Sequence, residues 1–187
     1  MNFVHTFPHV AVCIGLAINR APVMGVVYCP ALGLLYEAHK HLARPAQCNG
    51  RPIGVRQAAS LQQSLVCAEL GSERSQEKRD CVFANLQSVG WKCHGIRALG
   101  SAAMNICSVA EGQSNAYFEF GLHCWDMCAP VAILEAAGGF VCDTSGPEGA
   151  LDLMNRRLVV ACNKQVAGEL CAALVSQLQC KRDDDDD

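Results

Sequence analysis

Short apolar runs separated by proline or glycine dominate the first third of the chain. The runs cover residues 9–19, 23–30 and 32–39, and an Asn49-Gly50 pair marks a further turn. Apolar segments with turn residues every 8–12 positions are typical of consecutive antiparallel strands. The pattern predicts that residues 1–63 form part of an antiparallel β-sheet, ending in a polar linker over residues 57–63.

From residue 64 the pattern changes to an alternation of strands and helices. The predicted strands are residues 64–70, 92–99, 114–121, 140–145 and 157–163, and the predicted helices are residues 72–90, 101–112, 123–139 and 164–179. Such alternation is typical of α/β proteins, in which helices form layers on a sheet. We therefore expect a layered α/β fold with a second, α/β half over residues 64–180. Residues 181–187, KRDDDDD, are a like-charge run and are expected to form a disordered acidic tail.

Composition excludes several functional classes. Apolar residues make up 51% of the 187 positions and the net charge is -3, so a sizeable core is expected and general nucleic-acid binding is not. No run approaches the ~20 apolar residues of a membrane span, and no basic leader precedes the first apolar run. The thirteen cysteines lie singly among apolar residues, which is typical of free thiols in a reducing compartment. Cys124 and Cys128 lack a second pair at zinc-ligand spacing.

The first candidate site is the junction between a predicted strand and a predicted helix at Gly100-Ser101-Ala102. A helix N-terminus exposes unpaired N–H groups and receives phosphate readily. Gly100 lets the backbone approach a ligand closely, and Ser101 suits an N-cap. An ordinary capped helix explains the same residues, so both interpretations stay open.

The second candidate site is a pair of carboxylates, Glu119 and Asp126, on either side of a predicted strand-to-helix turn. Asp126 stands before a run with no charged residue until Glu135. Two carboxylates at one rim can hold a hard cation or accept hydrogen bonds from sugar hydroxyls. The alternative is that Asp126 is only a helix-start charge and Glu119 a solvated strand residue.

A further observation is a set of segments that recur together in one known family. They are WDMCAPVAILEAAGG and, in order along the chain, NFVHTFPHVAVCIGLAIN, GVVYCPALGLLYEA, CNGRPI, HGIRALGSAAMN, AYFEFGLHCWD and LDLMNRR. These segments resemble the inositol monophosphatase family, and WDMCAPVAILEAAGG is similar to its C-terminal signature. The resemblance covers nearly every residue from Asn2 to the acidic tail and is nearest to the animal-type enzymes. It implies the αβαβα sandwich shared with fructose bisphosphatases.

The resemblance also implies a function and its residues. The activity is Mg2+-dependent hydrolysis of myo-inositol monophosphate to inositol and phosphate, in phosphatidylinositol metabolism, by a cytoplasmic, lithium-sensitive homodimer that needs neither nucleic acid nor membrane. Asp126 matches a metal-binding aspartate that also meets the inositol ring. Gly100, Ser101 and Ala102 match a substrate-binding segment, and Glu119 matches a carboxylate that binds an inositol hydroxyl.

The sequence departs from the family pattern at its front. The family's first signature, Asp-Pro-Ile-Asp-Gly-Thr-Thr, is expected directly before Asn2, where Met1 stands. We therefore expect a chain truncated at the N-terminus, lacking the N-terminal helices, the first strands and most metal ligands, with an exposed sheet edge and apolar face. The alternative to the enzyme is thus a catalytically dead remnant that dimerises or binds anions. We expect this chain alone to hydrolyse inositol phosphate no faster than a buffer blank.

Overall fold

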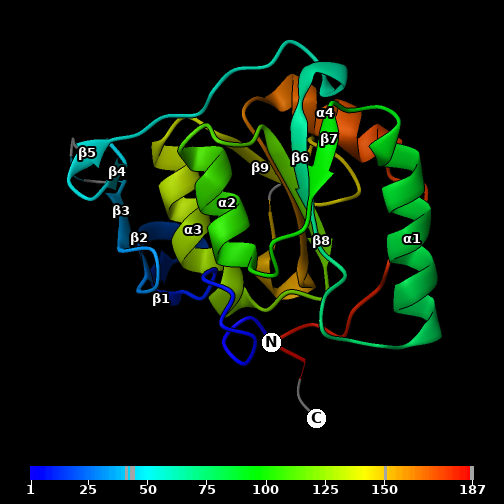
Figure 1. Ribbon diagram of the computed structural model, residues 1–187, viewed down its shortest axis with the longest axis horizontal. Helices are drawn as coiled ribbons and strands as arrows, with labels where there is room; N and C mark the ends of the chain where they lie inside the picture. The colour runs from blue at the N-terminus through cyan, green and yellow to red at the C-terminus, as the bar shows by residue number, and fades with distance from the viewer. Residues whose placement is uncertain (41, 43–44, 150, 186–187) are drawn as a thin grey trace.

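The chain folds into two five-stranded sheets with helices between them and on one outer side (Figure 1). This computed structural model describes residues 1–40, 42, 45–149 and 151–185. The expected layered α/β fold is confirmed.

The first sheet is an antiparallel meander, as the spacing of apolar runs predicts. Its strands follow chain order: β1 (Val12–Ile18), β2 (Ala21–Cys29), β3 (Leu34–His39), β4 (Gln47–Cys48) and β5 (Arg51–Pro52). The Asn49-Gly50 turn joins β4 to β5 with both residues at positive φ, 49° and 75°. Asn-Gly favours this backbone because both residues tolerate the left-handed region.

The second sheet is mixed, in the order β7-β6-β8-β10-β9. Its strands are β6 (Leu65–Ala68), β7 (Gly95–Arg97), β8 (Ala116–Phe120), β9 (Phe140–Cys142) and β10 (Arg157–Ala161). Strand β6 pairs in parallel with both β7 and β8, whereas β10 is antiparallel to its two neighbours. The carboxyl ends of β6, β7 and β8 therefore point to the same edge of the sheet.

Four helices complete the layers. They are α1 (Gln76–Gly90), α2 (Ala102–Ala110), α3 (Cys124–Ala136) and α4 (Lys164–Ala173), with short 3₁₀ turns at Leu61–Gln63 and Leu153–Asn155. Helices α2 and α3 lie between the two sheets, and α1 and α4 cover the outer face of the second sheet (Figure 1). Each side of the second sheet thus has its own apolar cluster. None of these helices, within the described residues, combines the length and apolarity needed to cross a bilayer.

Helix α4 is shorter than the predicted helix over residues 164–179. It ends at Ala173, and the chain turns extended at Leu174. The Asn85 side chain on α1 accepts hydrogen bonds from the amides of Val175 and Ser176, at 2.9 and 3.0 Å, and donates to the Ser176 carbonyl at 2.8 Å. The buried Asn85 side chain bonds to these backbone groups in place of partners within a helix. The amphipathic sequence pattern therefore extends past the residue at which the helix ends.

Helix α3 lies unusually close to the first sheet. Gly15 on β1 pairs with Gly25 on β2, and both face α3. A Cβ atom on Gly25 would stand 2.0 Å from the Ala129 carbonyl oxygen, and one on Gly15 would stand 2.8 Å from the Ala129 nitrogen. The missing side chains let the helix backbone rest directly on the two strands.

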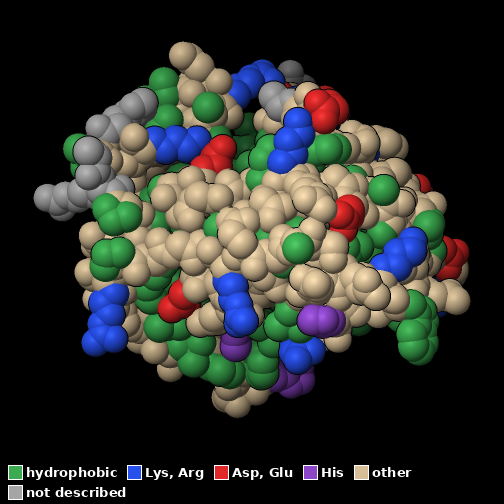
Figure 2. Space-filling view, turned by 90° about the horizontal axis from the view of Figure 1, so that it is seen from above, with side chains coloured by type: hydrophobic (Ala, Val, Ile, Leu, Met, Phe, Trp, Pro, Cys, Tyr) green, Lys and Arg blue, Asp and Glu red, His purple; other side chains and the backbone are tan. Residues whose placement is uncertain are grey.

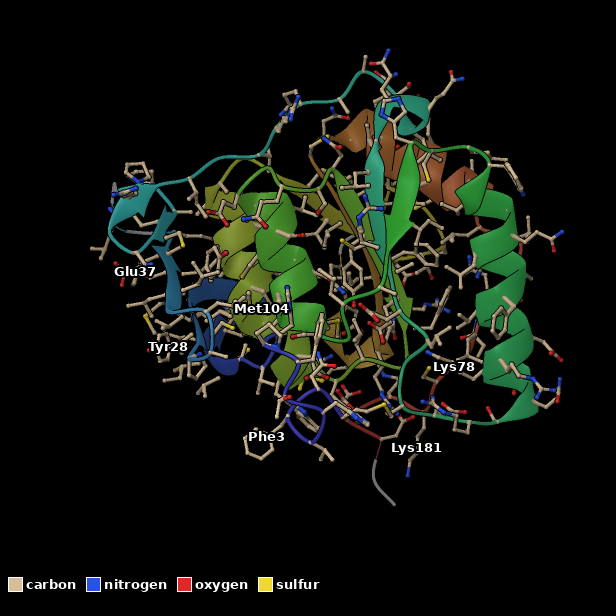
Figure 3. All side chains as sticks on the ribbon, viewed as in Figure 1. Phe3, Tyr28, Glu37, Lys78, Met104 and Lys181 are labelled. Carbon is tan, nitrogen blue, oxygen red and sulfur yellow. The ribbon has the colours of Figure 1, made fainter. Side chains whose placement is uncertain are left out.

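The opposite face of the first sheet is apolar and exposed. On β1, Val12, Ile14, Leu16 and Ile18 are 44–60% exposed, and β1 is the edge strand. Tyr28, the cross-strand partner of Val12, projects from the same face (Figure 3). The exposed edge and apolar face expected from the sequence are therefore present. The surface seen in Figure 2 has a different character, with Lys and Arg side chains dispersed among Asp, Glu and apolar groups.

The acidic tail, expected to be disordered, contacts the body of the protein as far as the structure describes it. Asp183 accepts a hydrogen bond from the amide of Cys124 at 2.7 Å and bonds to His123 Nδ1 at 2.7 Å. Arg182 donates to Asp152 at 2.9 Å. The N-terminal end of α3 attracts the Asp183 carboxylate, since helix N-termini favour negative charge. Residues 186 and 187 lie outside the described residues.

We expect Gly25→Ala to lower the free energy of unfolding by about 2 kcal/mol or more, because the added methyl group collides with the Ala129 backbone. Urea unfolding of the two proteins measures the difference. Gly54→Ala is the matched control, since a Cβ there meets only the Ala137 carbonyl oxygen at 3.7 Å. Equal losses in both variants would contradict the close approach of α3.

Candidate functional site

A pocket of about 700 Å³ lies at the carboxyl ends of β6, β7 and β8. Ligands of open α/β sheets commonly bind at this edge of parallel strands. Each strand contributes the segment that follows its last residues, and the start of α3 adds Asp126. The pocket is lined by Glu69–Arg74, Ala98–Ala103, Glu119–His123 and Asp126, with Lys78, Arg156 and residues near the N-terminus.

Glu69 holds the segment that leads into α2 by hydrogen bonds. Its Oε1 accepts three hydrogen bonds of 2.7 Å each, from the amides of Leu99 and Gly100 and from the Asn105 side chain. A carboxylate held by several N–H groups is fixed in place. The amide of Gly100 is thus already engaged by the protein.

The predicted segment Gly100-Ser101-Ala102 lines the pocket. Gly100 has a φ of 76°, in the region that favours glycine, and the Asn2 side chain lies against it. Asn2 Nδ2 donates to the carbonyls of His9 and Leu99, at 2.9 and 2.8 Å, which ties the N-terminal segment to this junction. Ser101 has the backbone of an N-cap, but its hydroxyl makes no capping hydrogen bond to any described residue. The ordinary-cap interpretation therefore does not explain its side chain.

Asp126 is in the first turn of α3 and lines the same pocket. Its Oδ2 accepts a hydrogen bond of 3.0 Å from the amide of His123. This contact is the helix-start role that the sequence left open. Oδ1 has no hydrogen-bond partner within the described part of the chain, so the carboxylate keeps one oxygen for a ligand.

Glu119 is buried rather than solvated. It is 8% exposed on β8, and the Tyr117 hydroxyl donates a hydrogen bond to its Oε2. Burial raises the pKa of Glu119 to about 7, although the Tyr117 hydrogen bond and the Lys78 ammonium act in the opposite direction. The alternative interpretation of Glu119 as a solvated strand residue is wrong, because all five β8 positions are buried between two helical layers.

Basic groups face these carboxylates across the pocket. Arg156 donates to the carbonyl of Leu122 at 2.9 Å and lies 3.6 Å from the Asp183 carboxylate. His123 Nδ1 also bonds to Asp183, so the tail carboxylate contacts both groups. Lys78 is buried beneath the turn after β8 and has no such carboxylate partner among the described residues. The pocket therefore combines acceptor carboxylates with one buried ammonium.

No group of three or more His, Cys, Asp or Glu side chains that could hold a metal ion occurs among the described residues. Asp126 offers one free carboxylate oxygen, and the Glu69 oxygen nearest α2 is already saturated. The side chains in the described ranges therefore do not form a complete metal site. An ion at Asp126 would take most of its oxygen ligands from water and phosphate.

The sequence predicted five pocket residues and missed two that matter. Gly100, Ser101, Ala102, Glu119 and Asp126 all line one pocket. Glu69 and Lys78 were not singled out. Glu69 lies near the end of the predicted strand over residues 64–70, and the rule that ligands gather at carboxyl ends of parallel strands could have found it. Lys78 lies on a polar-faced helix, where nothing in the pattern marks a buried residue.

Comparisons with known proteins agree with the geometry. A family model described as the inositol monophosphatase family matches residues 1–179. Human inositol monophosphatase 1 is 42% identical over 186 residues, and human inositol monophosphatase 2 is 39% identical over 185. The matches cover 99% and 98% of this chain but 65% and 62% of those proteins.

Solved structures give the same answer. The structure of inositol monophosphatase from Anabaena superimposes with a TM-score of 0.85 at 32% identity, covering 92% of this chain and 68% of that one. Sequence and fold agree along nearly the whole chain, and the chain belongs to the inositol monophosphatase family.

Proposed function

We propose that this protein is a phosphomonoesterase that hydrolyses myo-inositol monophosphate to inositol and phosphate. The observation that carries the proposal is the convergence of Glu119, Asp126 and the Gly100-Ser101-Ala102 segment on one pocket. The names of its relatives support the substrate class. In this proposal the buried Glu119 accepts a hydrogen bond from a ring hydroxyl, and Ser101 and Ala102 contact the substrate at the start of α2.

The family is generally metal-dependent, and we propose Mg2+ as the ion. Mg2+ prefers carboxylate, phosphate and water oxygens, and the free Oδ1 of Asp126 is such a donor. An ion held there by Asp126 would supply charge neutralisation and an activated water. We also propose that the protein is cytoplasmic and forms a homodimer. Light scattering of the purified chain tests the homodimer directly.

A second candidate is a module that binds inositol phosphate or anions without turning it over. The observation that favours it is the lack of a three-ligand metal cluster among the residues that the structure describes. Both candidates use the same pocket, so a binding measurement does not separate them, whereas a measurement of phosphate release does.

If this chain is the proposed enzyme, it releases phosphate from myo-inositol 1-phosphate only with Mg2+, and Asp126→Asn reduces the rate more than about 100-fold. Loss of even an outer partner of a metal ligand commonly costs ~10–100-fold. Phosphate release with and without a chelator measures both effects. Asp80→Asn, on the exposed side of α1, is the matched control and should keep the parental rate.

Two results would change the assignment. Binding of the ester without any turnover, in the presence of Mg2+, favours the non-catalytic module. Turnover that needs no metal, or that Asp126→Asn leaves intact, contradicts the proposed enzyme.

We expect affinity for myo-inositol to rise as the pH rises through about 7. The pKa of Glu119 in the fold is about 7, above its ordinary value of 4.5. The ionised carboxylate, which accepts a hydrogen bond from a ring hydroxyl, therefore predominates only above about pH 7. Titration calorimetry between pH 5.5 and 8.5, values chosen to be roughly symmetric about that pKa, measures the trend. Free inositol is the ligand because it has no titrating group there. Glu119→Gln should bind with no pH dependence, and a retained dependence would assign the titration to another group.

A further inference from the structure

Lys78 is a buried cation in an unfavourable place. It is 2% exposed and is the third residue of α1, where the positive end of the helix dipole repels an ammonium group. Figure 3 shows it between α1 and the second sheet. A buried charge without a carboxylate partner destabilises a fold, and such groups concentrate at functional sites.

The surroundings of Lys78 leave room for its ammonium. Nζ donates a hydrogen bond to the carbonyl of Phe120. A Cβ atom on either Gly71 or Gly121 would stand 3.2 Å from Nζ, and both glycines have positive φ, 72° and 81°. No side chain therefore projects toward the ammonium from these two positions.

Only one of the three N–H donors of Lys78 has a partner among the described residues. No described carboxylate lies within 4.0 Å of Nζ, whereas other lysines of the chain, such as Lys40 and Lys164, form ion pairs at 2.6 and 3.1 Å. Lys78 also lines the pocket. Two donors of a buried ammonium are thus available to a ligand there.

Glu119 lies next to this cation. The Cβ position on Gly71 that is 3.2 Å from Lys78 Nζ is also 3.6 Å from Glu119 Oε1. Tyr117 occupies Oε2 of the same carboxylate, which leaves Oε1 on the side of Gly71. A hydrogen-bond acceptor and a hydrogen-bond donor therefore converge on the glycine at the pocket wall.

We propose that Lys78 and Glu119 together recognise two adjacent hydroxyl groups of a polyol ring. Glu119 Oε1 accepts a hydrogen bond from one hydroxyl, and Lys78 Nζ donates a hydrogen bond to the oxygen of the neighbouring hydroxyl. This inference rests on the proposed function, because it needs a polyol phosphate in the pocket. It makes Lys78 a specificity-determining residue that selects phosphate esters of vicinal diols over esters without them.

The test compares two ligands that share a six-membered ring and a phosphate, myo-inositol 1-phosphate and cyclohexyl phosphate, of which only the first has hydroxyls. We expect Lys78→Met to weaken binding of the inositol ester about tenfold and binding of cyclohexyl phosphate less than about twofold, as for loss of one hydrogen bond to a charged group. Titration calorimetry of the full chain gives both dissociation constants. Lys92→Met, at an exposed lysine outside the pocket, is the matched control.

A thermal melt separates this role from a purely structural one. Replacing an unpaired buried charge by an apolar side chain is expected to leave the melting temperature unchanged or raise it. If Lys78→Met does not fold, Lys78→Gln decides, since its amide keeps N–H donors and should retain part of the preference for the inositol ester.

Equal weakening for both esters would show that Lys78 only attracts phosphate, and no weakening would show that it is not in contact with the ring. Either result overturns the inference while wild-type binding leaves the proposed function standing. If the wild-type chain binds neither ester, the proposed function fails and this inference fails with it.

Discussion

The contact of α3 with the Gly15–Gly25 pair fixes the relation between the first sheet and the rest of the molecule. Because two cross-strand neighbours lack side chains, the helix backbone at Ala129 rests on the strands themselves. Steric contact with backbone is far less adaptable than contact between flexible side chains. The direction of α3 is thereby set by the sheet, and its first turn carries Asp126 to the pocket. Pro130, inside α3, has no N–H to donate to the carbonyl of Asp126 four residues earlier, so the first turn of the helix lacks that hydrogen bond.

The second sheet supplies the other half of the site through the parallel pairing of β6 with β7 and β8. Parallel strands bring residues far apart in sequence to one edge, and here that edge gathers Glu69, Gly100 and Glu119. Glu69 is the link between them, because its carboxylate holds the chain leaving β7 at the angle from which α2 begins. Glu69 takes the amides of Leu99 and Gly100, which precede the N-cap Ser101, so this carboxylate does not occupy the first amides of α2 itself. In the proposed function, the α2 segment contacts the substrate through Ser101 and Ala102.

Local pattern was enough to predict most of the elements, and it failed where a distant side chain intervened. The Asn49-Gly50 turn and the antiparallel meander follow from residues that are close in sequence. The end of α4 does not, because Asn85 on another helix takes the amides of the last predicted turn. The same limit applies to the site. Glu119 has a polar side chain in an apolar strand, but its burial comes from layers packed on both sides, which no window of sequence contains.

Lys78 illustrates the limit most clearly, because every local rule argues against burying it. A lysine on the polar face of a helix and in its first turn is expected to extend into water. Its burial is a consequence of tertiary structure, since Gly71 and Gly121 belong to two different connections and meet only when α1 packs against the turn after β8. Among the described residues, no ion pair within 4.0 Å offsets the free-energy cost of burying Lys78. Lys78 also lies near Glu119, a carboxylate whose own burial is unfavourable. In the proposed recognition, a ligand that bonds to both groups offsets part of the free-energy cost of burying them, so that cost and the selectivity of the pocket have the same physical origin.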